Sequence, residues 1–298
     1  MDGDEEVSML LTREAGPNTP VSMELQFRAN EGESAPTEVR LTVGRLVLAN
    51  IAVEKELPKE TAAKLLPAMP DEEEMTLTAG DKQWTLSLAG LKAMLLKMDD
   101  KQGRIETPGA LIAKGTKPEN QVLPPIPMKT LIVPITPPTT KEDEKILAAL
   151  KEFLDAEFEA SQIANDTHKT ERRIERLSKD KLLVSMLIDT AAYNQTVAVW
   201  IVNDKPPYNP KPAIAGGEVY NSTEESVVEV LQNKGILHSS ARGRGMADCW
   251  FWASWAWTGK SFEKATESSS GMCRGFIGGT WDLPTFVSKV VNKNEKVE

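Results

Sequence analysis

Residues 241–284 read ARGRGMADCWFWASWAWTGKSFEKATESSSGMCRGFIGGTWDLP, and this stretch decides how the end of the chain folds. It holds both cysteines of the protein and five of its seven tryptophans. Two apolar runs, 255–257 and 262–265, flank Thr258-Gly259-Lys260, which is typical of a hairpin turn because glycine adopts positive φ without strain. The stretch therefore predicts a compact, locally stapled β module.

The two cysteines of this module, Cys249 and Cys273, predict a disulfide. No set of four ligands has zinc-site spacing, and neither histidine lies within the stretch. A return strand after the hairpin brings Cys273 back alongside Cys249, at the short Cα separation that a disulfide needs. The alternative is two free, buried thiols in a reducing compartment.

Composition limits the possible partners. With 298 residues the chain is long enough for two domains, and its 40% hydrophobic and 27% charged residues are ordinary for a globular protein. A formal net charge of -9 disfavours nucleic acid, because binding to a duplex rests on Lys and Arg at the phosphates. No apolar run reaches the roughly 18 residues of a membrane span. We expect neither a cofactor nor a metal.

The pattern along the chain predicts an α+β protein with two β-rich domains and a few helices, joined by a proline-rich linker and a charged helix. Residues 1–116 form the first domain, in which short alternating strands precede a helix capped by Ser87. Seven prolines mark the linker at 117–140, and 141–298 form the second domain. In that domain we expect an amphipathic helix from Lys141, a charged helical stretch at 169–181, a hairpin from 182–189 and 196–203, and a short final helix capped by Asp282.

Several motifs in order resemble an uncharacterised family of Gram-negative envelope proteins that is described only as a domain of unknown function. They are SMLLTREAGPNTPV (8–21), WTLSLAGLKAMLLKMDDKQGRIETPGALIAKG (84–115), AAYN (191–194), and GRGMADCW with CRGFIGG. The first half is also similar, more weakly, to invasion-associated locus B proteins. The resemblance implies export to the periplasm and transfers no reaction.

The N-terminus and one inner position depart from the family pattern. MDGDEEVSMLL has neither the positive region nor the apolar region of a signal peptide, so we expect a mature or truncated form. Ile188-Asp189-Thr190 stands where family members often carry a cysteine. Any family disulfide at that position is absent from this chain.

The candidate binding residues come from the tryptophan-rich module and from one hairpin tip. They are Tyr193, Asn194, Arg242, Arg244, Asp248, Trp255, Trp257, Arg274 and Trp281. Exposed tryptophans would stack on a sugar while Arg244 and Asp248 supply hydrogen bonds, and the arginines near glycines would converge on an anion. The alternatives are a buried tryptophan core, ordinary ion pairs, and an asparagine that bonds its own turn.

Two functions lead from the sequence, and a purely structural or inhibitory protein is a third possibility. The leading one is a non-catalytic envelope protein that binds a protein or a glycan through the C-terminal module. The alternative is a carbohydrate-active hydrolase that uses Asp248 and Asp282, which requires two carboxyl groups across a cleft and a raised pKa on one of them. His168 and His238 have no adjacent nucleophile in a catalytic motif, so an enzyme of the serine or cysteine class is not indicated.

Overall fold

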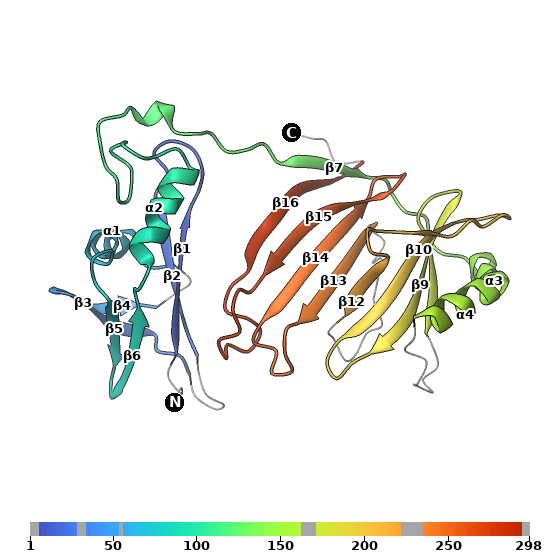
Figure 1. Ribbon diagram of the computed structural model, residues 1–298, viewed down its shortest axis with the longest axis horizontal. Helices are drawn as coiled ribbons and strands as arrows, with labels where there is room; N and C mark the ends of the chain where they lie inside the picture. Colours follow the sequence, from blue (N-terminus) through green and yellow to red (C-terminus); the bar gives the residue numbers. More distant parts are fainter. Residues whose placement is uncertain (1–5, 29–33, 54–55, 162–170, 222–234, 294–298) are drawn as a thin grey trace. The chain divides into compact units, whose positions relative to one another are not determined.

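The computed structural model describes residues 6–28, 34–53, 56–161, 171–221 and 235–293 (Figure 1). Its described elements are mostly strands, with four α-helices, so the chain is β-rich and broadly α+β. Contacts divide the chain into two compact units, Met1–Pro127 and Met128–Glu298. None of the described helices is long and apolar enough to cross a membrane.

The first unit contains a two-stranded sheet, a four-stranded sheet and two α-helices. Its elements are β1 (Val7–Arg13), β2 (Val21–Phe27), β3 (Glu38–Val43), β4 (Leu46–Ala52), α1 (Lys59–Ala68), β5 (Glu74–Ala79), β6 (Lys82–Ser87), α2 (Leu91–Lys101) and the 3-10 helix Glu119–Gln121. Strands β1 and β2 form a hairpin, and the second sheet has the order β4-β3-β5-β6. Alternate residues of β2 and β3, such as Met23 and Leu41, are buried in one core with Leu65 and Met75.

A buried polar network fixes the loop that follows α2. The carboxylate of Asp99 accepts hydrogen bonds from the backbone N–H groups of Leu111 and Ile112 at 2.8 to 2.9 Å. The guanidinium of Arg104 is fully buried and donates to the Gly16 carbonyl and the Thr19 hydroxyl in the β1–β2 turn. This segment belongs to the longest motif of the family resemblance, and here its polar residues have a structural role.

The second unit is built from two five-stranded sheets. The helix-covered sheet has the order β11-β10-β9-β8 with β12 against β10, and the tryptophan sheet has the order β13-β14-β15-β16-β7. The elements are β7 (Lys129–Val133), α3 (Lys141–Ala149), α4 (Lys151–Ala160), β8 (Arg172–Arg176), β9 (Lys181–Thr190), β10 (Gln195–Asn203), β11 (Lys211–Pro212), β12 (Glu218–Asn221), β13 (Ile236–Arg242), β14 (Trp250–Trp257), β15 (Phe262–Ser269) and β16 (Leu283–Asn292).

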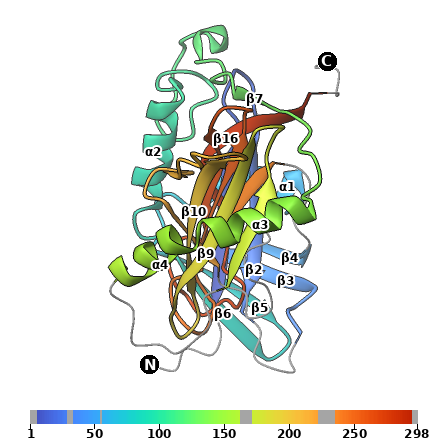
Figure 2. The same ribbon diagram turned by 90° about the vertical axis from the view of Figure 1, so that its right-hand side faces the viewer.

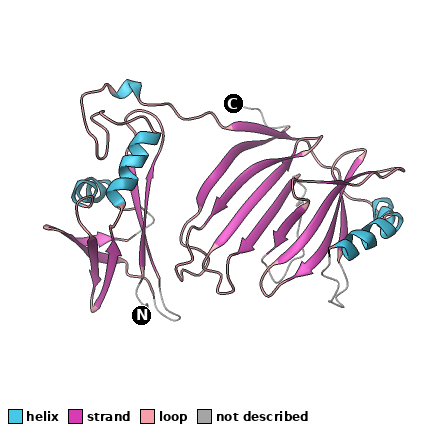
Figure 3. Ribbon diagram, in the orientation of Figure 1, coloured by secondary structure: helices cyan, strands magenta, loops and turns pink. Residues whose placement is uncertain are grey.

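Two hydrophobic clusters hold these layers together. Leu237 and Trp257 of the tryptophan sheet pack with Leu183, Val197 and Val199 of the helix-covered sheet. On the other side of the helix-covered sheet, α3 and α4 pack their apolar stripe against β8, β9 and β10. Figures 2 and 3 show the two helices beside this sheet. The helix-covered sheet is buried on both faces, which explains why β9 and β10 are almost continuously apolar.

The two central hairpin predictions are confirmed. Strand β9 pairs with β10, and β14 pairs with β15 around a turn in which Gly259 has φ 92°. The amphipathic helix expected from Lys141 is also present, as α3 and α4, and Thr140 and Asp143 form a capping box at its start.

Three local predictions are wrong. Ser87 ends β6, and α2 begins at Leu91 after Gly90. The charged stretch contains strand β8, which pairs with β9, in place of a helix. Residues 283–292 form strand β16 in place of the expected final helix, because their backbone groups pair with β15 and β7. Strand β7 itself lies within the proline-rich segment 117–140.

Candidate functional site

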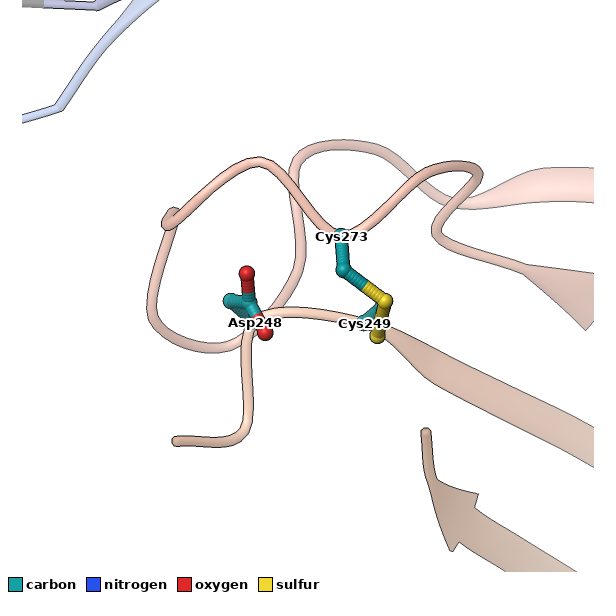
Figure 4. Close-up of side chains that lie close together, drawn as sticks. All are labelled: Asp248, Cys249 and Cys273. Atoms are coloured by element: carbon teal, nitrogen blue, oxygen red, sulfur yellow. A yellow bond between two sulfur atoms is a disulfide. The ribbon is translucent and has the colours of Figure 1, made fainter. Parts of the chain in front are cut away.

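A disulfide joins the two loops at one end of the tryptophan sheet. The sulfur atoms of Cys249 and Cys273 are 1.97 Å apart and their Cα atoms 4.7 Å apart, as the sequence predicts (Figure 4). One loop, 243–249, connects β13 to β14, and the other, 270–282, connects β15 to β16. The register places Arg242 opposite Trp250 and Ser269 opposite both Phe251 and Leu283, so both loops lie at the same end of the sheet.

The buried carboxylate of Asp248 organises these loops. It accepts hydrogen bonds from Nε of Arg244 at 2.7 Å and from the backbone N–H of Gly275 at 2.6 Å. The bond from Arg244 is the main reason why the pKa of Asp248 is lowered, against the opposing effect of burial. A general acid of a hydrolase needs the opposite shift. Asp248 therefore holds the two loops together. Asp282, the other candidate carboxylate, is exposed just before β16.

Asp248 and the two disulfide-bonded cysteines form the one cluster of possible metal donors among the described residues. Donor atoms of Asp248, Cys249 and Cys273 lie within 4.8 Å of one another (Figure 4). The two sulfurs are bonded to each other and carry no thiolate, and the carboxylate already has an arginine and a backbone N–H as partners. This donor set does not fit a metal ion while the disulfide is intact.

The hairpin tip between β9 and β10 is fixed to the end of β13. The Asn194 side chain donates to the Arg242 carbonyl at 2.9 Å and accepts from the Arg242 N–H at 2.9 Å. A side chain at Gly245 would meet the Tyr193 ring at 3.5 Å, so loop 243–249 passes close to this ring. Asn194 thus joins the two sheets, which is a structural use of a residue that the sequence offered as a ligand contact.

The tryptophans of β14 divide between the two faces of the sheet. Trp255 and Trp257 point to the face that packs on the helix-covered sheet, and Trp257 is fully buried. Trp257 is therefore unavailable to a ligand, and its place in the predicted site is corrected to the core. Trp250 and Trp252 lie on the opposite face and are both partly exposed.

Trp250 and Trp252 form a stacked pair on this opposite face. Their rings are parallel to within 4°, with centroids 5.9 Å apart. The guanidinium carbon of Arg242, directly opposite Trp250 on β13, is 5.4 Å from the Trp250 ring centroid, within range of a cation–π contact. The indole N–H of Trp250 donates to the Ala247 carbonyl at 2.8 Å, which fixes the ring.

Hydroxyl groups surround the pair on the neighbouring strands. Trp252 lies opposite Ser240 on one side and Ser268 on the other, while Ser254 lies opposite His238 and Thr266. The hydroxyl oxygens of Ser254 and Thr266 are 2.7 Å apart. We define the tryptophan face as Arg242, Ser240, His238, Trp250, Trp252, Ser254, Thr266 and Ser268.

His238 adds a neutral ring to this face. It remains exposed at the surface, yet partial desolvation by its neighbours lowers the pKa of its imidazole below the ordinary 6.5. At neutral pH it can therefore both donate and accept a hydrogen bond.

Most residues of the tryptophan face are absent from the set that the sequence suggested. The period of two in WFWASWAW contains the signal, since it places Trp250 and Trp252 on one side of the strand. Of the residues suggested, only Arg242 belongs to the face. Arg244 and Asp248 pair with each other, Arg274 is exposed on loop 270–282, and Trp281 is half-buried near its end.

Comparison with known proteins assigns the family. A family model described as "Protein of unknown function (DUF1176)" matches residues 1–288. The chain is 27% identical over 294 residues to "Uncharacterized protein YpfG" of Escherichia coli (strain K12). The matched region covers 91% of this chain and 82% of that protein. No solved structure matches the chain. The chain thus belongs to the DUF1176 family of proteins of unknown function.

Proposed function

We propose that this protein is an exported envelope protein that binds a glycan on the tryptophan face and catalyses no reaction. The stacked pair of Trp250 and Trp252, partly exposed beside hydroxyl-bearing strands, is the observation that carries the proposal. Contact between a large aromatic pair and water is unfavourable, and a ligand that covers the pair removes this contact.

The chemistry of the face suits a saccharide. The apolar C–H face of a pyranose ring packs on an indole, and its hydroxyls need partners that donate and accept hydrogen bonds. Ser240 and Ser268 flank Trp252 and can do both, as can neutral His238. The disulfide supports the export part of the proposal, because such bonds persist in oxidising compartments. The likeness of the first half to invasion-associated locus B proteins also stays part of this proposal.

The hydrolase alternative has less support. Its first carboxylate, Asp248, is buried and paired with Arg244, and its pKa is shifted in the direction that opposes acid catalysis. A protein partner at the same face is the remaining competitor, and the experiment below separates it from a glycan.

The test is direct binding to envelope saccharides. We expect the purified protein to bind soluble peptidoglycan fragments or envelope oligosaccharides on an array and in calorimetry. Replacing the stacking ring in Trp252→Ala should weaken binding about tenfold, the loss typical of an aromatic contact at the centre of a site.

Phe251→Ala is the matched control. Phe251 is 56% exposed on the same strand but points to the opposite face, so its loss should leave saccharide affinity unchanged. Equal losses in both variants, or capture of an envelope protein by wild type with no saccharide binding, would contradict the glycan proposal.

A further inference from the structure

Three large apolar side chains project from the disulfide-linked loops. Met246, on loop 243–249, is 52% exposed, and Met272 and Ile277, on loop 270–282, are 68% and 82% exposed. We call these three side chains the apolar loop tip. Exposed apolar groups concentrated at one end of a sheet indicate an interaction surface, because isolated ones scatter over a protein.

The backbone of the apolar loop tip is held in place. The Gly278 N–H donates to the Ala247 carbonyl at 2.8 Å, which brings the neighbours Ile277 and Met246 together. The disulfide fixes Cys273, which is next to Met272. The hydrogen bond from the Gly275 N–H to Asp248 fixes the chain between Cys273 and Ile277. The side chains therefore stay exposed on an ordered frame, which lowers the entropy cost of binding.

Two arginines lie beside the tip. Arg274 is exposed two residues from Met272, and the side chain of Arg244 keeps 47% of its surface exposed. One carboxylate of these loops, Asp248, is fully buried and accepts from the Gly275 N–H, and its ion pair with Arg244 balances the charge of that arginine. The other carboxylate of these loops is Asp282, the last residue of loop 270–282, which is exposed just before β16.

We propose that the apolar loop tip inserts into the interface of a bilayer that contains anionic phospholipid, with Arg274 at the headgroup phosphates. Side chains that project from separate loop ends can enter a fluid interface without preformed cavities, to a depth of about 5–10 Å. Guanidinium groups match phosphate charge and geometry. The chain has a net charge of -9, so attraction to an anionic surface must come from these local contacts.

Vesicle cosedimentation tests this proposal with the full chain. We expect wild type to sediment with phosphatidylglycerol vesicles. Ile277→Ser and Met272→Ser should each lower the partition coefficient about tenfold, as expected for one apolar side chain withdrawn from the interface. Arg274→Gln should lower binding to phosphatidylglycerol vesicles and leave binding to phosphatidylcholine vesicles unchanged.

Met94→Ser supplies the control. Met94 lies on α2 and is 68% exposed, equal to Met272, so the substitution is the same at equal exposure. No sedimentation of wild type at millimolar lipid, or an equal loss with Met94→Ser, would overturn the proposal. Thermal melting identifies any misfolded variant, and the two independent tip positions keep the test decisive. A negative result leaves the glycan proposal intact, because none of these residues belongs to the tryptophan face.

Discussion

At the scale of single residues, Asp99 is a carboxylate on which we expect the stability of the first unit to depend. It is fully buried, and both its oxygens accept from backbone N–H groups of the loop after α2. Removing it leaves these N–H donors without an acceptor in a buried site, and it takes away the carboxylate 3.9 Å from the buried Arg13 guanidinium. We expect Asp99→Ala to lower the free energy of unfolding by about 2–4 kcal/mol in urea denaturation.

Asp100→Ala is the control for this prediction. The neighbouring Asp100 side chain is 53% exposed and forms a surface ion pair with Lys97, so its loss should cost less than about 1 kcal/mol. Similar losses in the two variants would show that the buried network does not carry the stability assigned to it.

At the scale of elements, the disulfide ties the start of β14 to the loop before β16. Cross-linking residues 24 apart restricts the unfolded chain and should stabilise the second unit by about 3 kcal/mol. We therefore expect the double variant Cys249→Ser, Cys273→Ser to unfold at lower urea. The difference in unfolding midpoint should vanish when both proteins are compared under reducing conditions. A persistent difference would show that the disulfide is not the source of the added stability.

The ion pair between Asp143 of α3 and Arg176 of β8 makes the second unit sensitive to acid. The hydrogen bonds from Arg176 and Thr140 lower the pKa of Asp143 from 3.8 to about 2. A lowered pKa in the folded state gives stability that is complete above pH 4 or so and is lost as the pH falls toward 2. The loss from this one group should be about 2 kcal/mol.

Asp143→Asn tests this dependence. The variant is less stable at pH 7, because the charge-assisted pair with Arg176 is gone, but its unfolding free energy should fall less steeply between pH 5 and 2. Melting curves across this range decide the matter, and parallel slopes for wild type and variant would exclude Asp143 as the source.

At the scale of the whole molecule, the two units differ in what they offer. The first unit has a single core, with a polar network that fixes its longest loop. The second unit has two sheets, of which the helix-covered one is buried on both faces. On the tryptophan sheet, Trp250 and Trp252 stay partly exposed on one face and three apolar side chains are exposed on the loops at one end, and both proposals rest on this sheet.

The sequence by itself determined the features that local chemistry controls. Two apolar runs joined by a polar turn define the hairpin β9–β10, and a glycine turn defines β14–β15. The apolar stripe from Ile146 to Phe158 defines α3 and α4. The cysteine pair was also evident, because only one pairing is possible. In each case the interactions that decide the structure lie close together along the chain.

Only the tertiary structure decided which tryptophans are buried and what the charged segments become. Both pairs on β14 have the same spacing, and the packing of the helix-covered sheet on one face buries Trp257 and leaves Trp252 partly exposed. Strand β8 is stabilised by distant partners, since Arg172 and Arg176 pair with Asp155 and Asp143 on α4 and α3. Strand β16 likewise depends on backbone partners from β15 and β7, the latter from the start of the unit. Contacts between residues so far apart leave no periodic signal in either segment, so the sequence alone could not reveal them.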